Sequence, residues 1–177
     1  MDNKQIIALF VRNHPGVLLR VTSLISRRGF NIDSLTVSPA GVDGYSRMTI
    51  RINGDDNQVS QFINQMMKIV DVKKAQVLPE NNMVASELII IKVAKSDVDT
   101  HNEIISLTSS FHASLVNIGE NTLTFRASGT PSEIDTLVDE LNKYGIIEMA
   151  RTGIAALESG DARLFGAVPA QSIRALE

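Results

Sequence analysis

The sequence predicts an α+β protein made of two ferredoxin-like βαββαβ domains, each with an antiparallel sheet and its helices on one face. Apolar residues switch between the two-residue period of strands and the longer period of helices. The order of switching, β-α-β-β-α-β, occurs twice, and the polar stretch Pro79–Asn82 separates the copies. The expected divisions are a first domain at 1–79, a linker at 80–86, a second domain at 87–156 and a flexible tail at 157–177. A single larger α/β sheet is the alternative fold.

The first copy begins with the continuous apolar run Ile6–Val11, typical of a central strand. A helix follows, with apolar residues at helical spacing: Leu18, Val21, Leu24 and Ile25. Gly29 stands where a C-terminal cap belongs. Strands are expected at Ile32–Val37 and Tyr45–Ile52, and the alternation in the second predicts one solvated face that includes Thr49. A helix and a closing strand complete the copy, marked by Val59, Phe62, Ile63 and Met66 and by Val70, Val72 and Val77.

The second copy repeats this order after the linker. Its expected strands are Glu87–Val93, Ser114–Ile118, Thr122–Ala127 and Ile146–Ile154, and its first helix runs from about Val98 to Phe111. The segment Thr130–Glu133 combines a capping box with proline at the first helical position, which predicts the start of the second helix. The apolar stripe of that helix consists of Ile134, Leu137, Val138 and Leu141.

Composition places the chain among ordinary soluble globular proteins. Of its 177 residues, 44% are hydrophobic and 21% are charged, and the formal net charge is −3. The negative charge and the low aromatic content disfavour nucleic-acid binding. The absence of cysteine excludes disulfides and thiolate metal sites. Apolar runs are of strand length and the beginning of the sequence does not resemble a signal peptide, so we expect a cytoplasmic protein with no membrane segment.

The sequence lacks the motifs that usually carry catalytic groups. The three histidines, His14, His101 and His112, lack the spacing of metal ligands. We find no glycine-rich phosphate loop and no nucleophile elbow. The pair Asp55-Asp56 stands at a helix start, where acidic residues interact favourably with the helix dipole. We therefore expect neither catalytic residues nor a metal site.

The most informative segment is the turn Asn13-His14-Pro15-Gly16, which lies between the first strand and the first helix. Proline and glycine set a tight turn and let backbone N–H groups approach a ligand at the positive end of the helix. Asn13 before the helix and Asn31 after it add amides that both donate and accept hydrogen bonds. Such groups suit a free amino acid, which carries a carboxylate and an ammonium group. The alternative is structural: Gly16 only forms a turn, and Asn31 only enters a strand.

The topology predicts where these groups lie. The first two strands of a split βαβ unit run parallel, so the Asn13–Gly16 turn lies at one end of the sheet and Asn31 near the other. They reach one ligand only if two copies pair in opposite senses. We therefore predict a homodimer through residues 1–79, with the site built twice by a two-fold axis.

Three stretches, Asn13–Leu18, Arg27–Val37 and Ser46–Ile50, strongly resemble an amino-acid-binding ACT domain. More narrowly, the chain resembles the small regulatory subunits of acetohydroxyacid synthase, also called acetolactate synthase. The resemblance continues at Val70–Val72, Glu87–Leu88, Lys92–Val93, Tyr144–Ile146 and Ala150–Gly153, and covers nearly the whole chain. It implies an N-terminal ACT domain followed by an ACT-like domain.

This resemblance implies a non-catalytic subunit. Members of the family bind valine or a related branched-chain amino acid at the dimer interface, activate a separate large catalytic subunit and confer feedback inhibition on branched-chain amino acid biosynthesis. Thiamine diphosphate, Mg and FAD are then expected only in the large subunit, with no cofactor in this chain. The implied effector-binding residues are Asn13, Gly16, Val17 and Leu18 of one protomer and Asn31 and Ile32 of the partner.

Some segments depart from the family's pattern or lie where its members vary: His14-Pro15, Ala40–Gly44, Leu115–Ile118 and Glu158–Gly160. Two other functions are open on the sequence. One is a free-standing double-ACT sensor that controls a transcription regulator. The other is a small ferredoxin-like enzyme resembling an acylphosphatase, which requires a phosphate-binding loop with a placed arginine.

Overall fold

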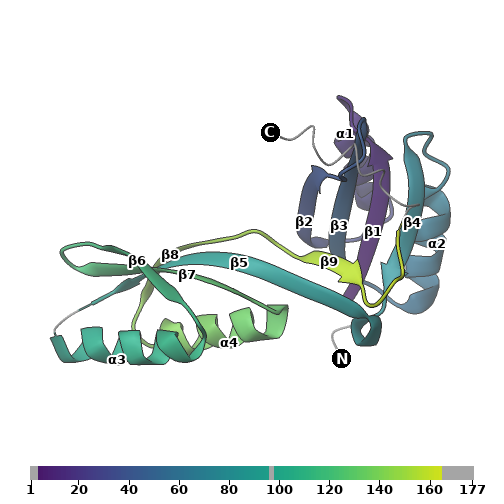
Figure 1. Ribbon diagram of the computed structural model, residues 1–177. Coiled ribbons are helices and arrows are strands. Elements are labelled where there is room, and N and C mark those ends of the chain that lie inside the picture. Colours follow the sequence, from purple (N-terminus) through teal and green to yellow (C-terminus); the bar gives the residue numbers. More distant parts are fainter. Residues whose placement is uncertain (1–3, 96–97, 165–177) are drawn as a thin grey trace. The chain divides into compact units, whose positions relative to one another are not determined.

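The computed structural model describes residues 4–95 and 98–164, which form two compact units (Figure 1). The first unit contains residues 4–84 and, from the other end of the described chain, residues 154–164. The second unit contains residues 85–153. Each unit has the predicted order of two helices and four strands, and the prediction of two ferredoxin-like domains is confirmed.

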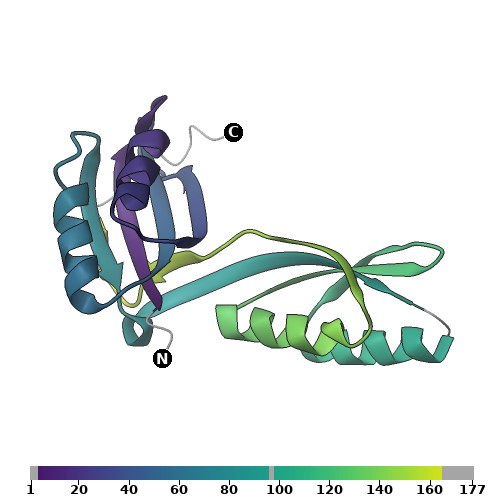
Figure 2. The ribbon, with the colours of Figure 1, turned by 180° about the vertical axis from the view of Figure 1, so that it is seen from behind.

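The first unit is a four-stranded antiparallel sheet in the order β2-β3-β1-β4, with both helices on one face (Figures 1 and 2). Its elements are β1 (Lys4–Arg12), α1 (Val17–Arg27), β2 (Ile32–Pro39), β3 (Tyr45–Asn53), α2 (Asp56–Met66) and β4 (Val72–Leu78). The apolar run of β1 is central because β3 and β4 pair with its two sides. β2 pairs only with β3 in this order and is therefore an edge strand.

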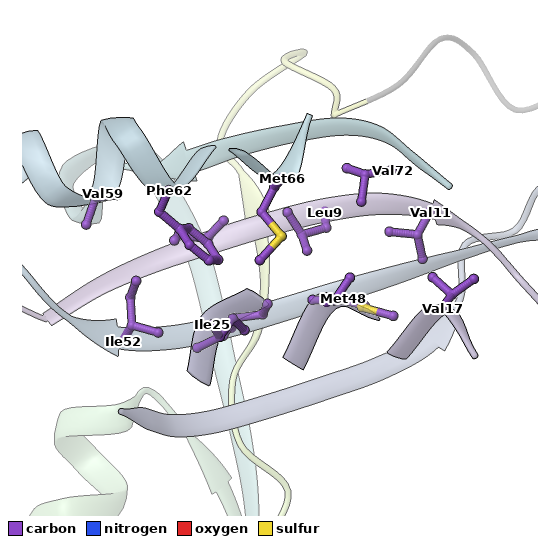
Figure 3. Packing of buried hydrophobic residues seen from close by; sticks show 13 residues of the cluster. Leu9, Val11, Val17, Ile25, Met48, Ile52, Val59, Phe62, Met66 and Val72 are labelled. Carbon is purple, nitrogen blue, oxygen red and sulfur yellow. The ribbon is translucent and has the colours of Figure 1, made fainter. Parts of the chain in front are cut away.

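The core of this unit lies between the sheet and its two helices. Figure 3 shows side chains of β1 and β3 pointing toward those of α1 and α2. Alternate residues of each strand face the helices, as the two-residue period requires. The buried members are Ile7, Leu9, Val11, Val17, Val21, Ile25, Met48, Ile50, Ile52, Val59, Phe62, Met66 and Val72.

Helix ends follow the local signals of the sequence. Gly29 has φ of 75° just after α1, where a left-handed residue lets the chain leave the helix. Asp55 caps α2: its side chain accepts from the N–H of Gln58, and the Gln58 side chain accepts from the N–H of Asp55. The acidic pair at this helix start therefore has a structural role.

The second unit repeats the arrangement with the equivalent strand order, β6-β7-β5-β8. Its elements are β5 (Met83–Ala94), α3 (Val98–Ser110), β6 (Ser114–Ile118), β7 (Thr122–Gly129), α4 (Pro131–Asn142) and β8 (Ile146–Arg151). The capping box predicted at Thr130 is present, with Pro131 in the first turn of α4. The core residues are Ile89, Ile91, Val93, Ile104, Leu123, Phe125, Ala127, Ile134, Leu137 and Leu141.

The C-terminal part of the described chain returns to the first unit. Strand β9 (Ala155–Glu158) pairs with β5. The side chain of Arg47 in β3 donates to the Ala156 carbonyl at 2.6 Å, and the Gln76 amide in β4 donates to Glu158 at 2.6 Å. Both Arg47 and Gln76 alternate with residues that face the helices, so β9 lies on the opposite face of the sheet (Figure 1).

This return corrects the prediction that the outer face of β3 is solvated. Thr49 is buried and Arg51 is largely covered. Alternating polarity indicated a wet face, but residues 154–164 belong to the same unit and Ala156 and Leu164 are buried there. A period-two pattern distinguishes the two faces of a strand without showing whether a distant segment covers the polar one.

The observed divisions also differ from the expected boundaries. The 80–86 segment is a 3₁₀ turn, η1 (Glu80–Asn82), followed by the first residues of β5. The strand expected at Ile146–Ile154 is β8, which ends at Arg151, and a separate strand, β9, begins at Ala155. Of the residues expected in the tail, 157–158 form the end of β9, and the chain then runs without a further strand to the buried Leu164. The remainder of the expected tail, 165–177, lies outside the described residues.

Candidate functional site

The candidate site is built around the turn that joins β1 to α1. Asn13 leaves the sheet with its N–H bonded to the Gly44 carbonyl at 2.8 Å. Gly16 has φ of 88°, a left-handed conformation that favours glycine, and it is the N-cap residue of α1. Its carbonyl accepts from the N–H of Arg20 at 3.1 Å. The turn is thus fixed at its sheet end and at its helix end.

The start of α1 differs from the starts of α2 and α4. Within the described residues, no side chain caps α1, whereas a complete capping box occupies the start of each of the other two helices. The Val17 N–H faces the His14 carbonyl at a long 3.4 Å. A helix start without a side-chain acceptor presents N–H groups and the positive end of the helix dipole. This geometry suits a carboxylate.

Apolar groups lie beside the turn. The Val17 side chain belongs to the core, so it contributes to a site only through its backbone. Leu18 is 44% exposed in the first turn of α1. Val37 lies on the edge strand β2 and is 43% exposed. It pairs with Met48, whose side chain faces the helices, so the Val37 side chain lies on that face too. The side chains of Leu18 and Val37 offer an apolar surface near the uncapped helix start.

Three side chains connect the turn to the rest of the unit. Nε2 of His14 lies 2.8 Å from a carboxylate oxygen of Asp71, and Arg20 donates to the other oxygen. Asp71 stands between α2 and β4 with its side chain 5% exposed, and its carbonyl accepts from the N–H of Arg12. The hydrogen bond to Asp71 raises the pKa of His14 above its ordinary value, and the same bond holds the pKa of Asp71 below its ordinary value.

Sequence reasoning singled out Asn13 and Gly16 but missed Arg20, Gly44 and Asp71. The sequence around Asp71 could have indicated its role, because an acidic residue between two valines interrupts the apolar pattern at the start of the closing strand. Arg20 lies one helical turn after Gly16, on the side of α1 that faces the turn. Gly44 acts through its backbone carbonyl, which the identity of the side chain does not reveal.

Asn31 and Ile32 lie away from this turn within the unit. Ile32 pairs with Ile52, which pairs with Gln5 at the beginning of β1, whereas Asn13 follows the end of β1. At the rise of a strand, the two ends of β1 are about 25 Å apart. Asn31 is exposed and its amide bonds weakly to Asp33 at 3.4 Å. The structure therefore does not bring the six expected effector residues together in one protomer.

Another buried carboxylate occurs in the second unit. The Glu87 side chain is fully buried and accepts from Arg151, whose guanidinium also donates to Asp135 at 2.6 Å and to the Pro131 carbonyl. These contacts join β5 and β8 to the start of α4. The surroundings of Glu87 indicate a structural role.

No group of three or more histidine, aspartate or glutamate residues is placed to hold a metal ion in the described part of the chain. No helix there is both long enough and apolar enough to cross a membrane.

Two family models match the chain. One, described as an AHAS small subunit-like ACT domain, matches residues 7–74, and the other, described as the small subunit of acetolactate synthase, matches residues 86–160. The acetolactate synthase small subunit of Mycolicibacterium smegmatis is 39% identical over 154 residues, which cover 87% of this chain and 90% of that protein. This chain belongs to the acetolactate synthase small-subunit family. The resemblance identified from the sequence is thereby confirmed.

Further relatives agree with this assignment. A probable acetolactate synthase small subunit of Archaeoglobus fulgidus is 39% identical over 158 residues, covering 89% of this chain and 98% of that one. The crystal structure of the acetolactate synthase small subunit from Thermotoga maritima superposes with a TM-score of 0.82 at 30% identity, and the match covers 90% of this chain and 99% of that chain. This chain thus shares its fold with a solved member of the family.

Proposed function

We propose that this chain is the regulatory subunit of an acetolactate synthase, and that it binds valine or a related branched-chain amino acid and controls a separate large catalytic subunit. The observation that carries the proposal is the uncapped start of α1 at Gly16, next to Asn13, in a chain of this family. The chain itself performs no catalysis in this proposal. Thiamine diphosphate, Mg and FAD are assigned to the large subunit.

The turn supplies complementary groups for each part of the effector. The N–H groups at the start of α1 hold the carboxylate, and the helix dipole favours its charge. The amides of Asn13 and of the partner's Asn31 hold the ammonium group and the second carboxylate oxygen. Leu18 and Val37 receive the branched side chain, since both are exposed apolar groups beside the turn.

A dimer formed through β2 would complete the site. β2 is an edge strand, and the outer edge of such a strand can accept a second strand. Antiparallel pairing of two copies of β2 about a two-fold axis sets the beginning of one, at Ile32, against the end of the other, near Val37. The end of β2 lies at the same end of the sheet as Asn13, because Ser38 and Phe10 both pair with Arg47. The partner's Asn31 and Ile32 then approach the turn.

Regulation follows from differential affinity. An effector shifts the equilibrium between two conformations only as far as it binds one more tightly than the other. A coupling of about 1–3 kcal/mol is sufficient for ordinary feedback control. We propose that the effector stiffens the dimer of N-terminal units and thereby changes how the chain holds the large subunit.

The function is tested by measuring acetolactate formation by the cognate large subunit, with and without this chain, across a valine titration. We expect the chain to raise the rate and valine to lower it. Gly16→Asp should keep the activation and weaken the valine response at least about ten-fold, because a carboxylate at the helix start repels that of the effector. Gly160→Asp is the matched control, since Gly160 also has a positive φ and open space but lies elsewhere. Partner binding with no effect on acetolactate formation would instead favour the transcriptional sensor.

A mixing experiment tests whether the site is shared between protomers. In a heterodimer of Gly16→Asp and Asn31→Ala chains, one site carries both changes and the other carries neither. Random mixing of equal amounts makes about half of the dimers heterodimers, and each of these has one unchanged site. About a quarter of all sites are therefore restored. If each site belonged to a single protomer, mixing would restore none. Valine binding by calorimetry after mixing the two variants decides between these arrangements.

A further inference from the structure

His14 occupies the centre of the Asn13–Gly16 turn, but its side chain leaves the turn and reaches Asp71. The turn and the α2–β4 connection are far apart in the sequence, and this side-chain contact joins them at 2.8 Å. The His14 side chain is 41% exposed, whereas that of Asp71 is almost completely buried. The contact therefore connects a position at the effector turn to a fixed point of the fold.

Both ring nitrogens of His14 face oxygen atoms that accept. Nε2 lies 2.8 Å from the Asp71 carboxylate, and Nδ1 lies 3.0 Å from the Pro15 carbonyl oxygen. A neutral imidazole has one N–H, so it satisfies one of these oxygens and turns a lone pair toward the other. The imidazolium has two N–H groups and satisfies both. The two oxygen neighbours therefore favour the imidazolium over the neutral ring.

The charges around His14 come from three elements. Among the described residues, the negative group that acts on it is Asp71 from the α2–β4 connection, and the positive group that opposes its protonation is Arg20 from α1. Arg12 at the end of β1 acts on Asp71 in turn. When His14 is protonated, three positive side chains, those of His14, Arg20 and Arg12, surround the single negative charge of Asp71. A net positive charge then lies beside the uncapped start of α1.

We propose that the His14 imidazolium, held by Asp71, positions the Asn13–Gly16 turn and supplies positive charge that strengthens binding of the effector carboxylate. The proposal rests on the proposed function of the turn as an effector site. His14 is a positioning residue, because its nitrogens bond to Asp71 and Pro15 rather than to the ligand. Because an imidazole titrates, the affinity for the effector then depends on pH.

The direction of the pH dependence follows from the protonation state. The Asp71 hydrogen bond raises the pKa of His14, so the imidazolium is fully present below the ordinary histidine pKa and is lost as the pH rises through the raised value. Effector affinity should therefore weaken as the pH rises. A pKa difference of one unit between the bound and free states corresponds to a ten-fold change in affinity, so we expect a loss of about three- to ten-fold.

The test compares the affinity for L-valine at about pH 6 and about pH 8 in the full-length chain and three variants, by calorimetry. His14→Gln removes the charge, and we expect weak binding that changes less than about two-fold between the two pH values. His14→Lys keeps a cation that does not titrate in this range, and we expect tight binding at both. His101→Gln, a histidine replaced in the second unit, should retain the slope of the parent chain.

Each outcome has a separate meaning. If His14→Gln keeps the slope of the parent, or if His14→Lys binds as weakly as His14→Gln, the inference is wrong while the effector site stands. If the parent chain binds neither valine, leucine nor isoleucine at either pH, the proposed function fails and this inference fails with it. Imidazole ¹⁵N spectra provide a readout without ligand: both His14 nitrogens should stay protonated to a higher pH in the parent chain than in the Asp71→Asn variant.

Discussion

The sheet of the first unit is covered on both faces, whereas the sheet of the second unit exposes apolar side chains on the face opposite its helices. The strand orders are equivalent, β2-β3-β1-β4 and β6-β7-β5-β8. In the first unit, Ala156 and Leu164 are buried where the chain returns. In the second, Ile90 and its cross-strand neighbour Ala150 are exposed. Two copies of one topology thus differ in burial because one of them receives an additional segment.

The starts of the helices differ in whether a side chain caps them. The helices α2 and α4 begin with complete capping boxes. In the described chain, α1 begins at Gly16 without a side-chain acceptor. Capping residues satisfy the first N–H groups of a helix and stabilise it. The start of α1 lacks this stabilisation, and its N–H groups are the ones that the proposed function assigns to the effector carboxylate.

The buried carboxylates differ in the exposure of their partners. Glu87 in the second unit accepts from Arg151, whose side chain is only 25% exposed. Asp71 in the first unit accepts from Arg20 and His14, both largely exposed. The Glu87–Arg151 contact stabilises the fold of the second unit, whereas the Asp71–His14 contact can respond to pH because His14 titrates.

The largest effect should come from Arg151→Met. It leaves the Glu87 carboxylate buried without its guanidinium partner, which should lower the free energy of unfolding of the second unit by about 4 kcal/mol. Arg20→Met should cause a smaller loss in the first unit, since Arg20 is 57% exposed and His14 still bonds to Asp71. Hydrogen exchange in β7 measures the stability of the second unit, and hydrogen exchange in β1 measures that of the first. Equal losses in the two variants would show that the carboxylates have equivalent roles.

Ala156→Asp and Ala150→Asp place the same charge at the helix-free face of the first sheet and of the second sheet, respectively. Ala156 is buried over the first sheet, so Ala156→Asp should lower the stability of that unit by about 3 kcal/mol. Ala150 is exposed in β8, and Ala150→Asp should cost less than about 1 kcal/mol. Denaturant unfolding followed by hydrogen exchange in β1 and β5 measures both values. A small loss for Ala156→Asp would mean that the returning segment contributes little to the first unit.

A further comparison of helix starts concerns α4. Thr130→Ala should cost about 1 kcal/mol, because it removes the side-chain cap. Hydrogen bonds from the Thr130 N–H and hydroxyl hold the pKa of Glu133 below its ordinary value. The contribution of Glu133 is therefore present above the ordinary glutamate pKa and is lost as the pH falls through the lowered value. Hydrogen exchange at the Thr130 amide should show this loss in acid, and Glu133→Gln should remove the pH dependence.

Much of the fold was predictable because its signals are local. Alternating apolar residues marked the strands, and the Thr130 capping box and Gly29 marked helix ends correctly. Thr49 was assigned to solvent because its neighbours in sequence carry no information about β9. The expected end of the second domain differed for the same reason, since the strand after Gly153 joins a unit whose other strands lie far earlier in the chain.

The sequence by itself determined the two-unit fold, the glycine turn before α1 and the membership of the acetolactate synthase small-subunit family. These depend on residue periods and short motifs, which act through neighbours along the chain. Only the tertiary structure showed that residues 154–164 cover the first sheet and that Asp71 holds His14 and Arg20 beside the turn. Such contacts join residues that are distant in sequence, and they form only when the strands and helices that carry them pack together.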